Sequence, residues 1–196
     1  WLGFESEKLV WQLEQEKLET DVPVQMERYV SKTDQTVTDR INGQQGEFDL
    51  AEQQATLQQQ VQLSALKIPL QTNSDIAVWN VNEGTVVIDK PVQIQHPKRK
   101  LSANANQGRL NLNTQILVLN GNVQALSQDQ QSLLAADEMT WNIQTQDVDG
   151  RGNVFYRQQD PATTVNGDRA VGNLERQTVV VTGNNVVTEI VPAGIE

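Results

Sequence analysis

Met139-Thr140-Trp141-Asn142-Ile143 is the third copy of a pattern that also stands at Ala77-Val78-Trp79-Asn80-Val81 and at Gly108-Arg109-Leu110-Asn111-Leu112. The central residues of these three copies lie 31 positions apart. Thirteen residues after each central residue comes a valine, at Val92, Val123 and Val154. A constant internal spacing of this kind indicates a repeated supersecondary unit rather than a chance similarity.

The same spacing extends toward both ends of the chain. Trp11 precedes Val24, Phe48 precedes Val61 and Asn173 precedes Val186, so six units follow one another at steps of 37, 31, 31, 31 and 32 residues. Two further columns of the repeat are apolar in every unit. They contain Leu13, Leu50, Val81, Leu112, Ile143 and Leu174, and then Leu18, Ala55, Val86, Leu117, Val148 and Val180.

Each unit has the pattern of a strand, a tight turn and a second strand. Alternation with period two, as in Trp79/Val81 and Val92/Ile94, predicts strands with one buried face. Just before its valine each unit carries a pair of residues that tolerates a bend. These pairs are Val22-Pro23, Gln59-Gln60, Lys90-Pro91, Gly121-Asn122, Gly152-Asn153 and Asn184-Asn185. Bent antiparallel strands repeated six times predict an all-β, jelly-roll-like slab over residues 1–196, with two facing sheets.

Two segments also carry helical signals. Residues 5–19 are rich in Glu, Lys and Leu, and residues 47–67 place apolar side chains at near-helical spacing. The equivalent columns elsewhere carry Val, Ile, Thr and Trp. Because agreement between local and global patterns is the stronger criterion, we expect strands in both segments.

Composition excludes several classes of function. The chain has 15 Lys and Arg against 25 Asp and Glu, and this net charge of −10 without a basic stripe argues against nucleic-acid binding. It has no cysteine, which excludes disulfides and cysteine-ligated metals, and its single His96 leaves little for catalytic dyads or triads. We therefore expect no enzyme, no cofactor and no metal. The four-residue turn-like stretch Asp147-Val148-Asp149-Gly150 fails the pattern of a calcium loop.

The recurring turn Leu119-Asn120-Gly121-Asn122-Val123, with its copies at Gly150–Val154 and Thr182–Val186, resembles the OstA-like periplasmic family of lipopolysaccharide transport. That family includes LptA, LptC and the periplasmic part of LptD, and the ending Gly183–Pro192 is most similar to the long, cyanobacterial-type LptC. The resemblance implies a single β-jellyroll domain over residues 1–196. It also implies a periplasmic protein held by an N-terminal inner-membrane anchor, so we expect this chain to be a fragment without that anchor.

The resemblance further implies an apolar interior, open along one side, that carries lipid acyl chains. Its candidate residues are the inward columns Trp11, Phe48, Trp79, Val81, Leu110, Leu112, Leu119, Val123, Trp141, Ile143 and Val154. The alternative is that these side chains only fill a packed sheet sandwich. The basic stretch His96–Lys100 is either a solvated hairpin tip or a contact for lipid phosphates or an acidic partner.

Two functions compete at this point. The first is a non-enzymatic bridge component that binds lipopolysaccharide and passes it across the periplasm for outer-membrane biogenesis. The resemblance implies an LptF/LptG-type extractor at the N-terminal edge and an LptA-like protein at the C-terminal edge, where the β-prone residues are Val179, Val180, Val181, Val186 and Val187. The second is a structural or adhesive β-repeat module that binds carbohydrate or protein.

Overall fold

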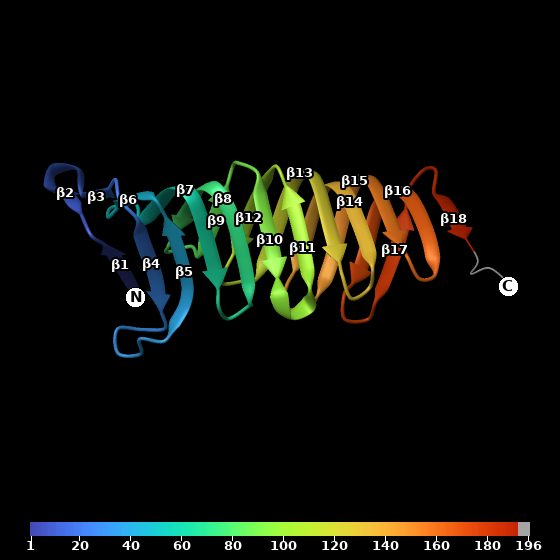
Figure 1. Ribbon diagram of the computed structural model, residues 1–196, viewed down its shortest axis with the longest axis horizontal. Helices are drawn as coiled ribbons and strands as arrows, with labels where there is room; N and C mark the ends of the chain where they lie inside the picture. Colours follow the sequence, from blue (N-terminus) through green and yellow to red (C-terminus); the bar gives the residue numbers. More distant parts are fainter. Residues whose placement is uncertain (192–196) are drawn as a thin grey trace.

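The computed structural model describes residues 1–191 and consists almost entirely of β-strands, which form an elongated slab (Figure 1). Six long strands run through the whole height of the slab: β7 (Gln54–Ala65), β8 (Leu70–Asn80), β13 (Ile116–Ser127), β14 (Ser132–Asn142), β15 (Asp147–Gln158) and β16 (Ala162–Asn173). The helical segments in this part of the chain are the single 3-10 turns η1 (Leu13–Gln15) and η2 (Pro97–Arg99). Neither has the length or the apolar run that a membrane-spanning helix needs.

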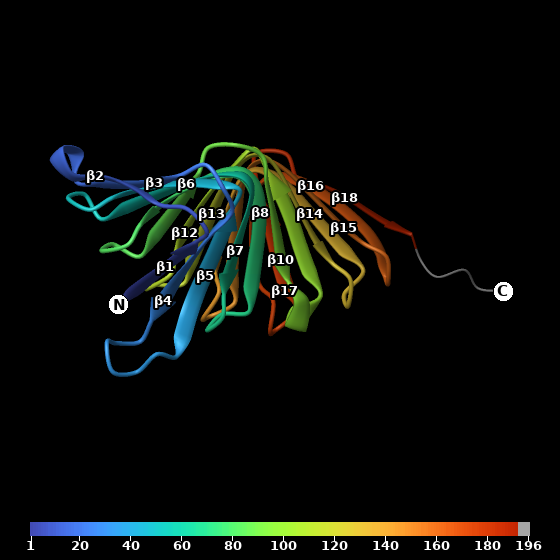
Figure 2. The same ribbon diagram turned by 60° about the vertical axis from the view of Figure 1, so that its left-hand side comes forward.

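Shorter strands complete two layers, between which the long strands pass. The first layer contains one half of each long strand together with β1 (Leu2–Ser6), β4 (Val24–Tyr29), β5 (Val37–Gly43), β10 (Val92–His96), β11 (Leu101–Ala105) and β18 (Val187–Val191). The second layer contains the other halves together with β2 (Val10–Gln12), β3 (Lys17–Thr20), β6 (Gln45–Asp49), β9 (Thr85–Ile88), β12 (Gln107–Asn111) and β17 (Thr178–Thr182). All of these pairings are antiparallel, and the layers diverge from a common curved edge (Figure 2). The predicted jelly-roll-like arrangement is confirmed.

The chain crosses from the second layer to the first at the bends that the sequence predicts. Within β7, β13 and β15 the register shifts there, and the left-handed residues are Gln59, Gln60, Gly121, Asn122, Gly152 and Asn153. In the other units the crossing separates two strands, at Pro23, at Pro91 and at residues 183–186. A Cβ atom added to Gly152 would lie 2.5 Å from Asp137 Oδ2, so this corner has no room for a side chain.

The return crossings use a column that the sequence analysis missed. Gln44, Asp75, Asn106, Asp137 and Asp168 stand 31 residues apart, each between first-layer and second-layer segments. The Asp137 carboxylate accepts a hydrogen bond of 2.7 Å from Asn153 Nδ2, and Asp168 accepts one of 2.9 Å from the backbone N–H of Asn184. These two contacts hold the return corners at Asp137 and Asp168 against the following crossings at Asn153 and Asn184. The 31-residue period itself was the signal that would have revealed them.

The hairpin turns of the second layer are also connected from unit to unit. Each turn ends on a residue with positive φ, and these residues are Glu16, Gln53, Gly84, Gln115, Gln146 and Gln177. The carbonyl of such a residue accepts the N–H of the first residue in the next turn, as in Leu112 N to Gly84 O at 2.8 Å and Ile143 N to Gln115 O at 2.9 Å. The turns therefore stack into a ladder along one free edge of the slab.

Three sequence expectations are settled by these elements. The helix-like segments 5–19 and 47–67 form strands and turns, apart from the single turn η1, because burial in the repeat overrides local propensity. In the sixth unit the residue equivalent to Trp141 is Gly172 rather than Asn173, because Gly172 pairs with Val148 on one side and Trp141 pairs with Val148 on the other. The extra residue of the last unit lies in its corner at residues 183–186. Residues 147–150 belong to β15 and form no turn.

Candidate functional site: an apolar cavity between the layers

Inward side chains form several parallel rows across each layer, and two of these rows, one from each layer, contribute to both the packed and the hollow part of the interior. Cross-strand register defines the first row as Phe4, Met26, Ile41, Leu63, Thr72, Ile94, Ala103, Ala125, Leu134, Tyr156 and Val165. The second row is Trp11, Leu18, Phe48, Ala55, Trp79, Val86, Leu110, Leu117, Trp141, Val148, Gly172 and Val179. The central residues of the repeat, among them Trp11, Phe48, Trp79 and Trp141, therefore lie in one continuous row along the second layer.

The rows pack tightly in the N-terminal half of the slab. Met26, Ile41 and Trp79 have no exposed surface, and Leu63 and Val86 are equally enclosed. These large side chains belong to one contiguous buried cluster that joins the two layers. The interior is solid at this end because Met, Ile and Leu of the first row face Trp and Val of the second.

The interior becomes hollow in the C-terminal half. A cavity of about 490 Å³ lies between the layers, and its apolar walls include Leu117, Leu119, Leu134, Met139, Val148 and Ala170. The first row carries Ala103 and Ala125 here, and the second row carries Gly172, so the side chains no longer fill the space between the layers. A volume of this size lies within the roughly 300–1,000 Å³ range of small-molecule sites.

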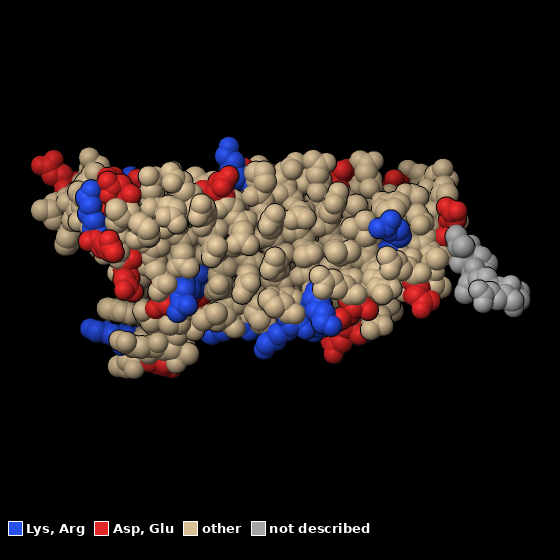
Figure 3. Space-filling view, in the orientation of Figure 1, with Lys and Arg blue, Asp and Glu red and all other residues tan. Residues whose placement is uncertain are grey.

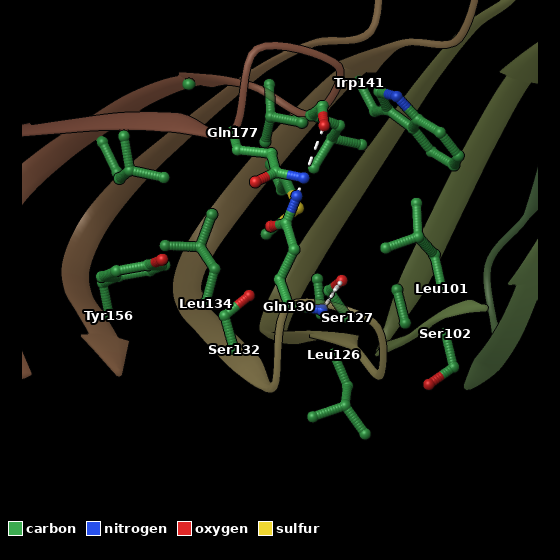
Figure 4. Close-up of a pocket in the computed structure, with 18 of the residues that line it drawn as sticks. Leu101, Ser102, Leu126, Ser127, Gln130, Ser132, Leu134, Trp141, Tyr156 and Gln177 are labelled. Carbon is green, nitrogen blue, oxygen red and sulfur yellow. Dashed lines mark hydrogen bonds between the residues drawn. The ribbon is translucent and has the colours of Figure 1, made fainter. Parts of the chain in front are cut away.

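Polar side chains surround the mouth of the cavity, where the free ends of the layers approach each other. Gln130, in the turn between β13 and β14, donates a hydrogen bond of 3.4 Å from Nε2 to the carbonyl of Leu174 in the second layer. The amide groups of Gln130 and Gln177 face each other across the mouth (Figure 4). Ser132 and Tyr156 complete this polar border.

Two more contacts join the layers along this side. The ring centroids of His96 and Trp141 are 5.7 Å apart, and Arg28 Nη1 donates to Asn113 Oδ1 at 3.2 Å. The resemblance implies an interior that is open along one side. The described chain instead is bridged at three places on that side, and side chains of two of these bridges, His96–Trp141 and Gln130–Leu174, line the cavity.

His96 belongs to the cavity and not to the solvated tip. It is 5 % exposed and lines the cavity, and burial, followed by the nearby charges of Arg99 and Lys98, lowers its pKa. The imidazole is therefore neutral at pH 7. Burial likewise raises the pKa of the Tyr156 hydroxyl. His96 and Tyr156 are therefore both uncharged in the cavity wall near neutral pH.

The structure buries nine of the eleven predicted interior residues. These nine are Phe48, Trp79, Leu110, Leu112, Leu119, Val123, Trp141, Ile143 and Val154, while Val81 is half-buried against the same core. Trp11 contradicts the prediction, because its side chain is 61 % exposed. It lies on β2, which pairs only with β3 among the described strands, and no first-layer strand of the described chain covers it.

Of these candidates, only Leu119 and Trp141 line the cavity. The sequence analysis missed Leu134, Met139 and Tyr156, because it followed only the columns of the second layer and the crossing bends. Ala103 and Ala125 were the sequence feature that could have indicated a cavity. They replace larger side chains at inward positions of the first row, but their effect depends on what faces them.

Both ends of the slab present strand edges. In the described chain β17 and β18 each pair with β16 alone, and β1 and β2 each pair with one strand. Val179, Val180, Val186 and Val187 are 39–61 % exposed, and Val181 is half-buried against a small cluster with Ala136, Val154 and Ala170. Leu9, Val10 and Leu13 are exposed at the other end. The predicted edges are therefore present at both ends.

The carboxylates of β15 are engaged with their neighbours. Two arginines, Arg169 and Arg151, lower the pKa of Asp149 to about 2, and Arg169 Nε lies 2.9 Å from Asp149 Oδ1. Asp147 accepts hydrogen bonds from Thr145 and Asn173. Within residues 1–191 no group of three or more metal-ligating side chains comes together.

The two layers and the bent long strands define a β-jellyroll, and comparisons with known proteins show its family. The family model described as "Lipopolysaccharide-assembly, LptC-related" matches residues 77–190, so the chain belongs to the LptC-related family. Membership of this family makes the chain a transport component rather than an enzyme. A search of curated proteins finds no match.

Among solved structures, the chain is similar to LptH from Pseudomonas aeruginosa, described as the LptA homologous periplasmic component of the conserved lipopolysaccharide transport device. The two share 13 % identity, with a TM-score of 0.57 over 63 % of this chain and 96 % of LptH. At this level of identity the similarity concerns the fold.

Proposed function

We propose that this protein is a bridge component of lipopolysaccharide transport that holds acyl chains of the lipid in the cavity between its layers. The observation that carries the proposal is the cavity of about 490 Å³ walled by Leu117, Leu134 and Met139, in a chain of the LptC-related family. An accessible apolar interior favours a lipid carrier over a structural or adhesive module, whose interior would be fully packed.

Burial of acyl chains supplies the binding energy in this mechanism. Each buried methylene contributes about 0.8 kcal/mol, so a few carbons outweigh the weak hydrogen bond of Gln130 at the mouth. The net charge of −10 gives no general attraction for an anionic lipid. The acyl contribution is therefore insensitive to salt, since screening acts on charges and not on apolar contacts.

The strand edges support the proposed partners. An LptA-like protein would add a strand to β17 or β18, and an LptF/LptG-type extractor would lie at the edge formed by β1 and β2. Strand addition aligns the interiors of successive jelly rolls, which gives a lipid a continuous path. In this proposal the protein works in the periplasm, where LptH is a component of the transport device, and is anchored to the inner membrane by a segment beyond these residues.

Lipid extraction from the purified protein tests the proposal. We expect mass spectrometry to find a bound acylated lipid. Ala125→Phe should reduce its amount about tenfold, because the phenyl ring takes the space of about two acyl methylenes, each of which contributes about 0.8 kcal/mol when buried. Ala125 points into the cavity and Gln124 points out of it, so Gln124→Phe is the matched control and should load normally. Equal loading of both variants would show that the cavity does not hold the lipid.

A further inference from the structure

The hairpin tip between β10 and β11 borders the cavity on both of its sides. Ile94 and His96 precede the tip and Leu101 and Ser102 follow it, and all four line the cavity. The turn η2 between them carries Lys98 and Arg99. Lys and Arg side chains gather along the edge of the slab where the first-layer tips lie, at the bottom of the view in Figure 3.

The cations of this tip differ in their partners. Lys100 donates to Asp129 Oδ1 at 2.7 Å and is thereby neutralised by the next tip. Within residues 1–191, neither Lys98 nor Arg99 takes part in an ion pair or a side-chain hydrogen bond. Lys98 is exposed and Arg99 is half-buried, and both charges act on His96 in the cavity wall.

This combination is found at one tip of the repeat. The position of Lys98 is occupied by Lys67 one unit earlier, and by Asp129 and Asp160 one and two units later. The position of Arg99 is occupied by the buried Ile68, then by Gln130 and Pro161. Among these four tips of the described chain, only the tip with Lys98 and Arg99 carries two unpaired cations. It lies where the packed half of the slab meets the hollow half.

We propose that Lys98 and Arg99, on the tip that borders the cavity, form an anion site that binds a phosphate on the headgroup of the lipid whose acyl chains lie inside. This site rests on the proposed function and adds a determinant of lipid selectivity to it. The guanidinium of Arg99 can bind two phosphate oxygens with its planar fork, while Lys98 supplies a compact charge beside it. An apolar cavity beside two unpaired cations matches an amphiphile with an anionic head.

The test compares lipid A that carries its phosphates with the same lipid after their removal. We expect the wild-type protein to bind the phosphorylated lipid about tenfold more tightly at low salt, which is the effect of one or two charge-assisted hydrogen bonds, and to lose most of that preference at about 0.5 M salt. The double variant Lys98→Gln/Arg99→Gln should bind both lipids with the wild-type affinity for the dephosphorylated form. Lys67→Gln, at the same position of the preceding tip, is the matched control and should keep the preference.

Each other outcome overturns the anion site in a recognisable way. If the wild type binds both lipids equally, the site is wrong while acyl binding in the cavity stands. If neither lipid binds, the proposed function fails together with the site. If the double variant keeps its phosphate preference but loses an acidic protein partner, the tip is a protein-docking surface. If inorganic phosphate binds the wild type but not the double variant, while the phosphates of the lipid add nothing to its affinity, the site serves free phosphate.

Discussion

Replacing Trp79 by alanine is expected to lower the free energy of unfolding by about 3–5 kcal/mol, the usual cost of truncating a buried aromatic side chain. Trp79 has no exposed surface and lies in the second row between Ala55 and Val86, within the buried cluster that joins the layers. The small neighbour Ala55 cannot fill the resulting void. Chemical denaturation followed by circular dichroism measures the effect.

Trp11→Ala is the matched control, because Trp11 occupies the same column of the repeat but is 61 % exposed. We expect it to change the free energy of unfolding by no more than about 0.5 kcal/mol, as is typical of surface substitutions. A similar cost for both variants would contradict the assignment of a packed N-terminal half and an exposed first hairpin.

Deletion of residues 177–196 is expected to abolish binding of an LptA-like partner while the protein remains folded and able to bind lipid. The last five of these residues, 192–196, lie outside the described structure. None of residues 177–189 is buried, so the deletion removes β17 and β18 without removing a fully buried side chain. It takes away the half-buried Val181 beside Ala136 and one end of the cavity lining, at Gln177–Val179. It does remove the strand edges that would pair with the partner, which is why binding should be lost completely.

A pull-down with the partner and a thermal melt together separate the possible explanations. The melt should show one cooperative transition close to that of the full chain, and Trp11→Ala, at the opposite end, should retain the partner. Full partner binding by the truncated protein would refute the role of the C-terminal edge. A truncated protein that does not melt cooperatively would show instead that β17 and β18 form an essential part of the core.

The repeat predicts which side chains face inward but not what they face. Three tryptophans of one column have three different environments: Trp11 is exposed, Trp79 is fully packed and Trp141 lines the cavity. The column fixes their common orientation through register and period two. Their burial depends on the opposite layer, whose residues are distant in sequence.

The cavity and its mouth could not be predicted from the sequence for the same reason. The cavity arises because the small residues Ala103 and Ala125 of one layer and Gly172 of the other leave the space between the layers unfilled. The size of that space depends on how the two layers face each other, which the sequence of either layer does not show. The hydrogen bonds that join the free ends of the two layers connect residues 44 and 85 positions apart, Gln130–Leu174 at the mouth and Arg28–Asn113 elsewhere on the same side. Bends at Gly121 and Gly152, by contrast, could be predicted because their cause is local.

A photo-crosslinking amino acid at Leu134 or Leu133 tests most directly whether lipid occupies the space between the layers. Successive residues of a strand point to opposite faces, and of these two neighbours on β14 only Leu134 lines the cavity, in the same row as Tyr156 (Figure 4). Irradiation in cells that make lipopolysaccharide should attach the lipid at position 134 and leave position 133 unlabelled. Equal labelling at both positions, or labelling at 133 alone, would contradict an interior lipid site.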